Sequence, residues 1–272
     1  MGQMMKDSEL IFGLMAAFGK SEYTAGQLLH LTAPFGVSES SLRTSLSRMT
    51  GKTMLTVRRC GKTAYYRMGE RGIRIRKNVS LGFGADDWQG WDGRFWGMLF
   101  SVPAQQAQAR HRIRTKLVKR RFACQYPGFW VRPMRSSERV PEVFAAETAT
   151  PHCRLIRFEH QEALTAAQAQ ELWQTDAVAA RIKSGLTALE RARLALRGVP
   201  APQALIEKMT VGSEIAGILA DDPLLPPQYL PENWAADALR HAWRAFDRDA
   251  TAASRPYWQE VFESEEDRHE NR

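Results

Sequence analysis

The sequence has few cysteines, and their positions suit neither disulfides nor a metal site. Its 272 residues include three cysteines, Cys60, Cys124 and Cys153, with no CxxC spacing between them. An odd number of widely separated cysteines argues against a disulfide framework and against a zinc finger. His152 stands beside Cys153, but a metal needs further ligands at suitable spacing. We therefore expect a cytoplasmic protein without a metal site.

Long hydrophobic runs and catalytic motifs are also absent. No apolar segment approaches the roughly 20 residues that a membrane-spanning helix needs, so we expect no membrane partner. The chain has no GxSxG nucleophile elbow, no phosphate-binding GxxxxGK[ST] loop and no histidine pair at metal-ligand spacing. We therefore expect neither an enzyme nor a cofactor.

Basic charge is plentiful and unevenly distributed. The formal net charge is +8. Residues 1–80 contribute +8 and residues 81–135 contribute +7, whereas residues 136–272 contribute −7. A polyanion would be attracted by the first half and repelled by the second. This asymmetry favours a first half that binds nucleic acid or another anionic ligand.

Residues 36–52 have the pattern of a helix that can lie in a DNA groove. Ser38 can cap the helix, and Leu42, Leu46 and Met49 fall on one face at helical spacing. The opposite face carries hydroxyl and guanidinium groups, which can donate to phosphates and base edges. Its residues are Ser40, Ser41, Arg43, Thr44, Ser47 and Arg48. A solvated helix face could have the same composition, so this helix alone favours neither interpretation.

The neighbouring segments predict a helix-turn-helix followed by a basic hairpin. Residues 9–19 form one amphipathic helix, and Thr24 opens a short second helix with a capping box. Residues 54–59 and 63–68 are predicted to be two strands of a hairpin. A hairpin directly after the helix expected within residues 36–52 would make a winged helix. The hairpin carries side chains that can grip a phosphate backbone: Arg59, Lys62 and Tyr65. A basic hairpin is often only a charge-protected edge, but helix, hairpin and charge together favour DNA binding.

The central part of the chain predicts a second domain. A buried strand at 95–102, a helix of about 20 residues from Pro103, and strands at 128–132 and 154–158 suggest a ferredoxin-like α/β sandwich. This region also looks like the small ferredoxin-like nucleases associated with CRISPR loci. Those hold a metal with an aspartate at the end of the first strand, where this chain has Ser101, so we do not expect a nuclease.

The last part of the chain is predicted to be helical. Helices are expected at 164–173, from an Asp176 cap to about Gly198, at 202–220 and at 235–248. Prolines impose an extended path on residues 221–234, and the charged tail 263–272 should fray. We therefore expect an α+β protein of three domains, covering residues 1–80, 81–160 and 161–272.

Five motifs, spread over nearly the whole chain, occur together in one order. They are residues 36–49 in the candidate DNA helix, Tyr65-Tyr66 in the hairpin, residues 91–93, residues 100–103 and the proline-rich residues 222–234. This set resembles the PaaX family, transcriptional repressors of phenylacetate-degradation operons. The resemblance implies an N-terminal winged helix-turn-helix, a central ferredoxin-like domain and a C-terminal helical domain. It also implies a homodimer on a palindromic operator in double-stranded DNA, released by an aryl-CoA thioester such as phenylacetyl-CoA.

Specific residues can be assigned roles as hypotheses. Ser40, Arg43, Thr44 and Ser47 would read base edges, Arg48 and Lys52 would hold phosphates, and Ser38 and Ser41 complete the DNA-facing set. Residues of the central domain could bind the effector: Trp91, Trp96, Arg112, Arg114, Trp130 and Arg132. Buried tryptophans more often serve packing or a dimer interface. The helix that starts at Pro103 is rich in arginine; it could hold the phosphates of a CoA ligand, add to the DNA-binding surface or, more often, have a solvated face. Two alternatives are an acyl-CoA-binding or acyl-CoA-acting enzyme with an appended DNA-binding domain, and an architectural DNA-binding protein without an effector.

Overall fold

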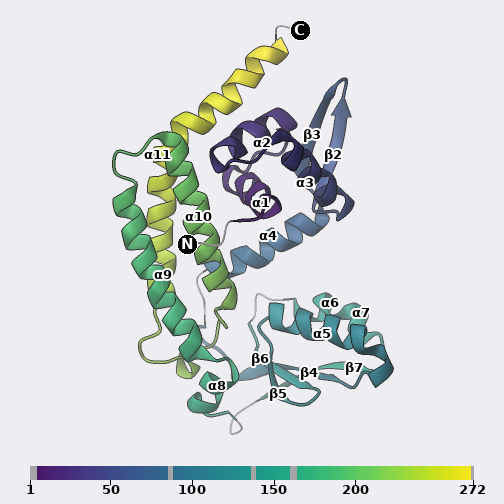
Figure 1. Cartoon of the computed structure of the whole chain (residues 1–272). Helices are drawn as coiled ribbons and strands as arrows, with labels where there is room; N and C mark the ends of the chain where they lie inside the picture. Colours follow the sequence, from purple (N-terminus) through teal and green to yellow (C-terminus); the bar gives the residue numbers. More distant parts are fainter. Residues whose placement is uncertain (1–4, 85–87, 136–138, 160–163, 271–272) are drawn as a thin grey trace. The chain divides into compact units, whose positions relative to one another are not determined.

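The computed structural model describes residues 5–84, 88–135, 139–159 and 164–270 (Figure 1). They form two compact units. The first comprises Met1–Gly84, Ile182–Ala220 and Ala236–Arg272, and the second comprises Ala85–Arg181 and Asp221–Ala235. Each unit combines helices with a small antiparallel sheet, which confirms the predicted α+β class. In the described part of the chain, no helix has both the length and the apolar character needed to cross a membrane.

Three helices begin the first unit: α1 (Asp7–Phe18), α2 (Ala25–Thr32) and α3 (Glu39–Gly51). The predicted capping box is present, since Thr24 and Gln27 exchange side-chain and backbone hydrogen bonds at the start of α2. A short 3-10 turn, η1 (Ala33–Phe35), leads through Gly36, whose φ of 75° suits glycine, to α3. The three helices bury one apolar core. Its helical members include Leu10, Ile11, Leu14, Leu28, Leu31, Leu42, Leu46 and Met49.

A three-stranded antiparallel sheet accompanies these helices. It contains β1 (Tyr23–Thr24), β2 (Leu55–Cys60) and β3 (Thr63–Met68), in the spatial order β1-β3-β2. The predicted hairpin is therefore present, with its turn at Gly61 and Lys62. The residues after the hairpin form α4 (Glu70–Phe83).

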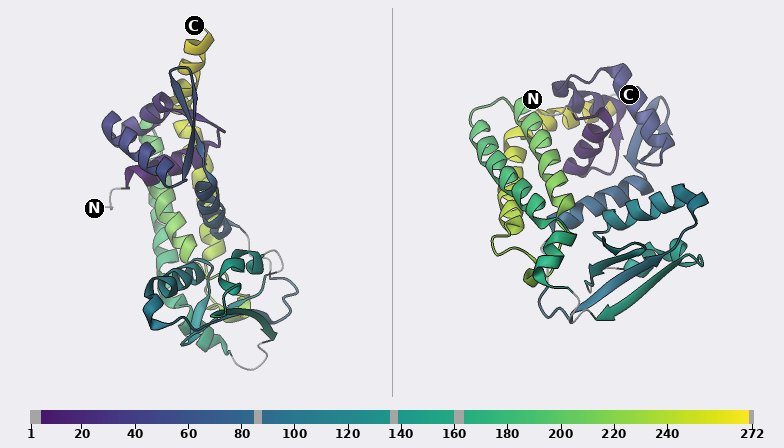
Figure 2. Two further views of the ribbon diagram at one scale, coloured as in Figure 1. Left: turned by 90° about the vertical axis from the view of Figure 1, so that its right-hand side faces the viewer. Right: turned by 60° about the horizontal axis from the view of Figure 1, so that its bottom comes forward.

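Three long C-terminal helices belong largely to the same unit. They are α9 (Thr175–Ala195), α10 (Ala201–Asp221) and α11 (Ala236–Glu270), and Figures 1 and 2 show them running side by side. Gly185 of α9 permits this close packing, because a Cβ there would lie 2.8 Å from the Ile218 side chain. The predicted cap at Asp176 was wrong, since α9 begins one residue earlier and Asp176 lies in its first turn.

The last helix, α11, is much longer than the sequence predicted. We expected a helix over 235–248 and a frayed tail from 263, whereas α11 continues to Glu270 with Pro256 inside it. Burial explains the extension. Val261 is 5% exposed and joins the core formed by α1, α2 and α3, while Trp258 and Phe262 pack against Phe18. Tertiary packing thus outweighs the helix-breaking tendency of proline and the polar character of the tail.

The second unit is built on a four-stranded antiparallel sheet. Its strands are β4 (Arg94–Phe100), β5 (Ala123–Tyr126), β6 (Phe129–Pro133) and β7 (Cys153–Glu159), in the order β5-β6-β4-β7. The sequence predicted three of these strands and missed β5. This strand lies at the edge of the sheet and lacks the β-branched residues that mark strands.

Helices cover the two faces of this sheet differently. After the short η2 (Ala104–Gln106), α5 (Ala107–Lys119) packs on one face with the short α6 (Val140–Val143) and α7 (Ala145–Thr148). The regular helix therefore begins after the predicted start at Pro103. The other face is partly covered by α8 (Ala166–Leu172) and η3 (Pro227–Tyr229). Its open part carries exposed apolar side chains, among them Leu99 and Tyr126.

Candidate nucleic-acid interface

Helix α3 separates a buried apolar stripe from an exposed polar face. Ser38 caps the helix as predicted, since its Oγ accepts a hydrogen bond from the Ser41 backbone N–H at 3.2 Å. Ser41 is half-buried and its hydroxyl donates to Asp7 of α1, so it ties the helix to the core. The other predicted DNA-facing side chains of α3 and its C-terminal end are exposed. They are Ser40, Arg43, Thr44, Ser47, Arg48 and Lys52.

Two of these exposed side chains are held by their own helix. Arg43 pairs with Glu39, one turn earlier, at 2.5 Å between Nη2 and Oε1. Thr44 donates its hydroxyl hydrogen to the Ser40 carbonyl oxygen at 2.9 Å. Side chains that are 76% and 59% exposed form a weak ion pair, so Arg43 can exchange Glu39 for another acceptor at small cost. Within the described chain, Arg48 and Lys52 have no ion pair.

The hairpin presents its basic side chains on two faces. Strand register places Arg58 opposite Tyr65 and Arg59 opposite Ala64, so Arg59 and Tyr65 point to opposite faces. Tyr65 is half-buried beneath the Arg58 guanidinium, 4.6 Å from the ring centroid. Arg59 and Lys62 are exposed and have no ion pair among the described residues. The three predicted hairpin residues therefore do not share one face.

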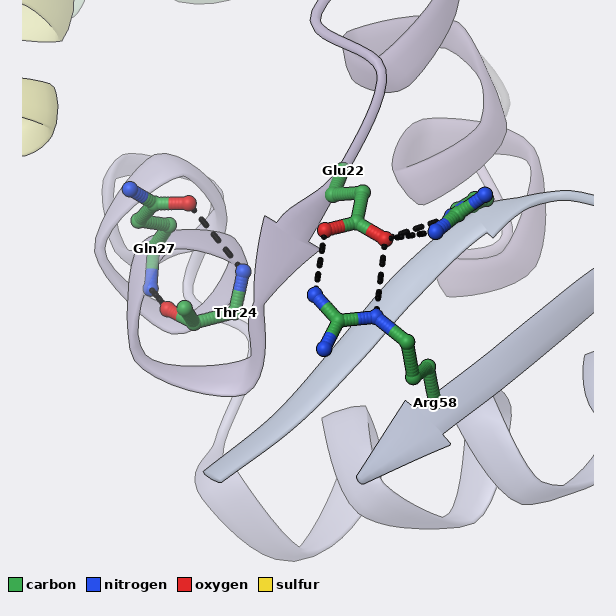
Figure 3. A network of polar contacts seen from close by, with 5 residues as sticks. Glu22, Thr24, Gln27 and Arg58 are labelled. Atoms are coloured by element: carbon green, nitrogen blue, oxygen red, sulfur yellow. Dashed lines mark hydrogen bonds and ion pairs between the residues drawn. The ribbon is translucent and has the colours of Figure 1, made fainter. Parts of the chain in front are cut away.

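Two further hairpin arginines are bound by a carboxylate (Figure 3). Glu22, directly before β1, accepts hydrogen bonds from Arg58 Nη2 at 2.8 Å and Arg58 Nε at 3.3 Å. The same carboxylate pairs with Arg67 of β3. The hydrogen bond from Arg58 is the main cause that lowers the pKa of Glu22. Glu22 therefore stays ionised at neutral pH and keeps both guanidinium groups engaged.

The predicted effector-binding residues are divided between the two faces of the central sheet. Trp96 and Trp130 are buried with α5 on one face, where Arg132 is 3% exposed and donates to the Arg120 carbonyl oxygen at 2.7 Å. Trp91 lies on the opposite side, in edge-to-face contact with Phe95 and Tyr229. Arg112 and Arg114 are exposed on α5. The structure thus brings Trp96, Trp130 and Arg132 to one face of the sheet. It does not bring the other three predicted residues, Trp91, Arg112 and Arg114, into this group.

Comparison with known proteins connects this geometry to one family. Residues 8–72 match a model described as "PaaX-like protein", residues 88–170 match "PaaX protein central Cas2-like domain", and residues 173–260 match "PaaX-like protein C-terminal domain". These three matches span most of the chain. The chain belongs to the PaaX family.

Two known proteins are similar to this PaaX-family chain over most of its length. One is "Transcriptional repressor PaaX" of Escherichia coli (strain K12), 22% identical over 240 residues that cover 85% of this chain and 75% of the relative. The other is a solved structure, "Uncharacterized protein Rv0674 from Mycobacterium tuberculosis", with a TM-score of 0.61 and 22% identity. That comparison covers 94% of this chain and 99% of the solved chain, and at this identity it supports the fold alone. Family membership supports a DNA-binding transcriptional regulator rather than an enzyme.

Sequence reasoning missed one part of the interface of this PaaX-family chain. It predicted a basic hairpin but not that Glu22 pairs with Arg58 and Arg67 of that hairpin. The partners are separated by 36 and 45 residues, and only the pairing of β1 with β3 brings them together. A signal was nevertheless available, because residues 10–38 contain a single acidic residue.

Proposed function

We propose that this PaaX-family chain is a transcriptional repressor that reads DNA with a winged helix-turn-helix. In this proposal α2 and α3 form the helix-turn-helix, α3 lies in the major groove, and the β2-β3 hairpin is the wing. One observation carries the proposal. Helix α3 buries Leu42, Leu46 and Met49 and exposes a face of hydroxyl and guanidinium groups, with Arg59 and Lys62 beyond it on the hairpin. These groups donate to base edges and phosphates, as DNA recognition requires.

Roles within this face follow from the chemistry of each side chain. Arg43, Thr44, Ser47 and Ser40 read base edges, and each bidentate contact of an arginine with guanine discriminates by about 1–3 kcal/mol. Arg48 and Lys52 hold phosphates beside the groove. On the hairpin, Arg59 and Lys62 contact the neighbouring backbone, while Tyr65 supports Arg58 through its ring.

The operator and the assembly form the second part of the proposal. Two copies bind a palindromic operator, with their α3 helices about 34 Å apart, one turn of DNA. We propose three domains along the chain, covering residues 1–80, 81–160 and 161–272, with most of the third joining the first in one compact unit, and a ferredoxin-like central domain. The order β4-α5-β5-β6-α6/α7-β7 supports that fold, because it follows the β-α-β-β-α-β plan. The unpaired, exposed Cys60 and Cys124 fit a reducing cytoplasm.

The effector is proposed to be an aryl-CoA thioester of a phenylacetate-type catabolic pathway, bound by the central domain. The indole N–H groups of Trp96 and Trp130 support this proposal, because both are buried and neither meets an acceptor in the described part of the chain. A buried donor without an acceptor costs about 1–3 kcal/mol, which a ligand carbonyl could recover. Release requires that the ligand prefer a conformation whose two α3 helices no longer match the operator.

Titration of the purified protein on the DNA upstream of its own gene tests the proposed function. A fluorescently labelled duplex is titrated in the absence and presence of a panel of aryl-CoA esters, with a scrambled duplex as control. We expect tight binding to the upstream duplex and its loss with one ester. Equal binding to both duplexes would exclude a site-specific repressor, and indifference to every ester would exclude the proposed effector class.

A further inference from the structure

Glu22 occupies two of the hairpin's arginines in the way that a DNA phosphate would. Arg58 presents Nε and Nη2 to the two carboxylate oxygens of Glu22, which is the bidentate geometry that guanidinium groups use for carboxylates and phosphates alike. Arg67 binds the same carboxylate. A phosphate can take these donors only if it displaces Glu22.

The sheet register explains why this carboxylate meets both arginines. Tyr23 pairs with Tyr66 and Thr24 with Tyr65, so the residue before β1 stands opposite Arg67. Side chains alternate between the two faces of a sheet, which puts Glu22, Arg67 and Arg58 on one face. The Glu22 side chain is only 20% exposed, whereas the arginines are 52% and 48% exposed. The carboxylate is thus sheltered between two cations that themselves reach the surface.

We propose that Glu22 is a specificity-determining residue, which withholds Arg58 and Arg67 from the DNA backbone. The hairpin then attracts phosphates only through Arg59 and Lys62, and sequence-independent binding is limited. This inference rests on the proposed DNA-binding function, because it concerns the same hairpin. It assigns to an acidic residue, held between two arginines of the hairpin, control over the ratio of specific to non-specific affinity.

The salt dependence of binding distinguishes engaged arginines from withheld ones. Each phosphate neutralised by a cation releases counterions, and the slope of log K against log[salt] changes by about 0.9 per phosphate. Two arginines released from Glu22 should therefore steepen the slope by up to about 1.8. Release of the two arginines should also raise the affinity for non-specific DNA, since that affinity comes almost entirely from contacts between cations and phosphates.

The test compares two carboxylates of the full-length protein that differ in location. Glu22→Gln removes the charge and keeps the size of the side chain. Glu147→Gln is the matched control, because Glu147 is also 20% exposed and paired, with Lys116 in the second unit. Both variants gain one unit of positive charge. We expect Glu22→Gln to bind a random-sequence duplex several-fold more tightly at low salt and with a steeper slope, while Glu147→Gln follows the wild type.

A second variant keeps the inference testable if Glu22→Gln does not fold. Arg58→Gln/Arg67→Gln removes the withheld cations, so its salt slope should equal that of the wild type. A shallower slope would show that these arginines already contact DNA and would overturn the proposal. Equal behaviour of Glu22→Gln and Glu147→Gln would overturn it too, as would weaker binding of Glu22→Gln with an unchanged slope. Failure of the wild type to bind any duplex would instead refute the proposed function.

Discussion

The guanidinium of Arg240 donates from Nε to the carbonyl oxygen of Gly82 at 2.8 Å. Arg240 lies on α11 and is 3% exposed, whereas Gly82 lies at the C-terminal end of α4. Arg244, one turn further along α11, donates to the Phe83 carbonyl oxygen at 3.0 Å. The last carbonyls of a helix have no partner within it, and positive charge is favourable there. Two arginines of α11 therefore provide hydrogen-bond donors for the last carbonyl groups of α4, the helix that follows the hairpin.

Replacement of Arg240 should destabilise the first unit. Arg240→Met removes a buried charged donor and leaves the Gly82 carbonyl unsatisfied, so we expect a loss of about 1.5–3 kcal/mol in unfolding free energy. Urea denaturation followed by circular dichroism measures this loss. Arg244→Met is the control, because Arg244 is exposed and water can replace it. Equal losses in the two variants would contradict the role of burial.

Two glycines in helices should respond to alanine in opposite directions. A Cβ at Gly82 would lie 2.5 Å from the Leu219 carbonyl oxygen, a backbone atom that cannot move alone, so Gly82→Ala should cost about 1–3 kcal/mol. Around Gly217 of α10 nothing lies within 4 Å of the added carbon. Gly217→Ala should stabilise by about 0.4–1 kcal/mol, because alanine restricts the unfolded chain. Thermal unfolding of both variants checks the sign of each effect, and a shared sign would contradict the packing.

Arg43 and Lys62 should affect DNA binding in different ways. In the proposed function Arg43 reads a base edge, so Arg43→Ala should weaken binding to the operator by about 1–3 kcal/mol and bring it closer to the affinity for scrambled DNA. Lys62 is proposed to contact one phosphate, so Lys62→Ala should weaken binding to both duplexes similarly and reduce the salt slope by about 1. Fluorescence anisotropy at several salt concentrations separates the two. An unchanged specificity ratio for Arg43→Ala would exclude its base-reading role.

Tyr23 should make stability depend on alkaline pH. Burial raises the pKa of its hydroxyl, which donates to the Met15 carbonyl oxygen at 3.3 Å. In the unfolded chain the pKa of tyrosine is near 10. As pH rises, Tyr23 therefore loses its hydroxyl proton in the unfolded chain before it does so in the folded protein. The stability that the protonated Tyr23 hydroxyl gives to the folded state is fully present below about pH 10. It is lost as pH rises through the pKa of Tyr23 in the folded protein.

Denaturation of the wild type and Tyr23→Phe between pH 9 and about 11 tests this dependence. Tyr23→Phe should lose less stability over that range, although it starts lower because a hydrogen bond is missing. Tyr126→Phe, changed at an exposed ring, should follow the wild type. Parallel curves for the wild type and Tyr23→Phe would show that this hydroxyl does not govern the alkaline loss.

The elements around α3 could be predicted because local interactions define them. The caps at Thr24 and Ser38 each involve residues three positions apart, and the hairpin joins strands across two residues. Periodicity likewise identified Leu42, Leu46 and Met49 as core. Such signals lie within a few residues of each other, so the sequence displays them directly.

The remaining features depend on contacts that the sequence does not display. The path of α11 follows from burial of Val261 against helices more than 200 residues earlier, and the Glu22 network follows from strand pairing. Arg59 and Tyr65 were both predicted to grip the phosphate backbone, yet strand alternation puts them on opposite faces of the hairpin. Trp91 and Trp96 were grouped by type, although they lie on opposite faces of one sheet.

The shared core of the first unit has a consequence for the order of folding during synthesis. Leu205, Met209 and Val261 complete the core that α1, α2 and α3 begin. A ribosome releases residues 1–84 long before it has made these three side chains. The newly made N-terminal segment therefore keeps part of its apolar surface uncovered until almost the entire chain has emerged.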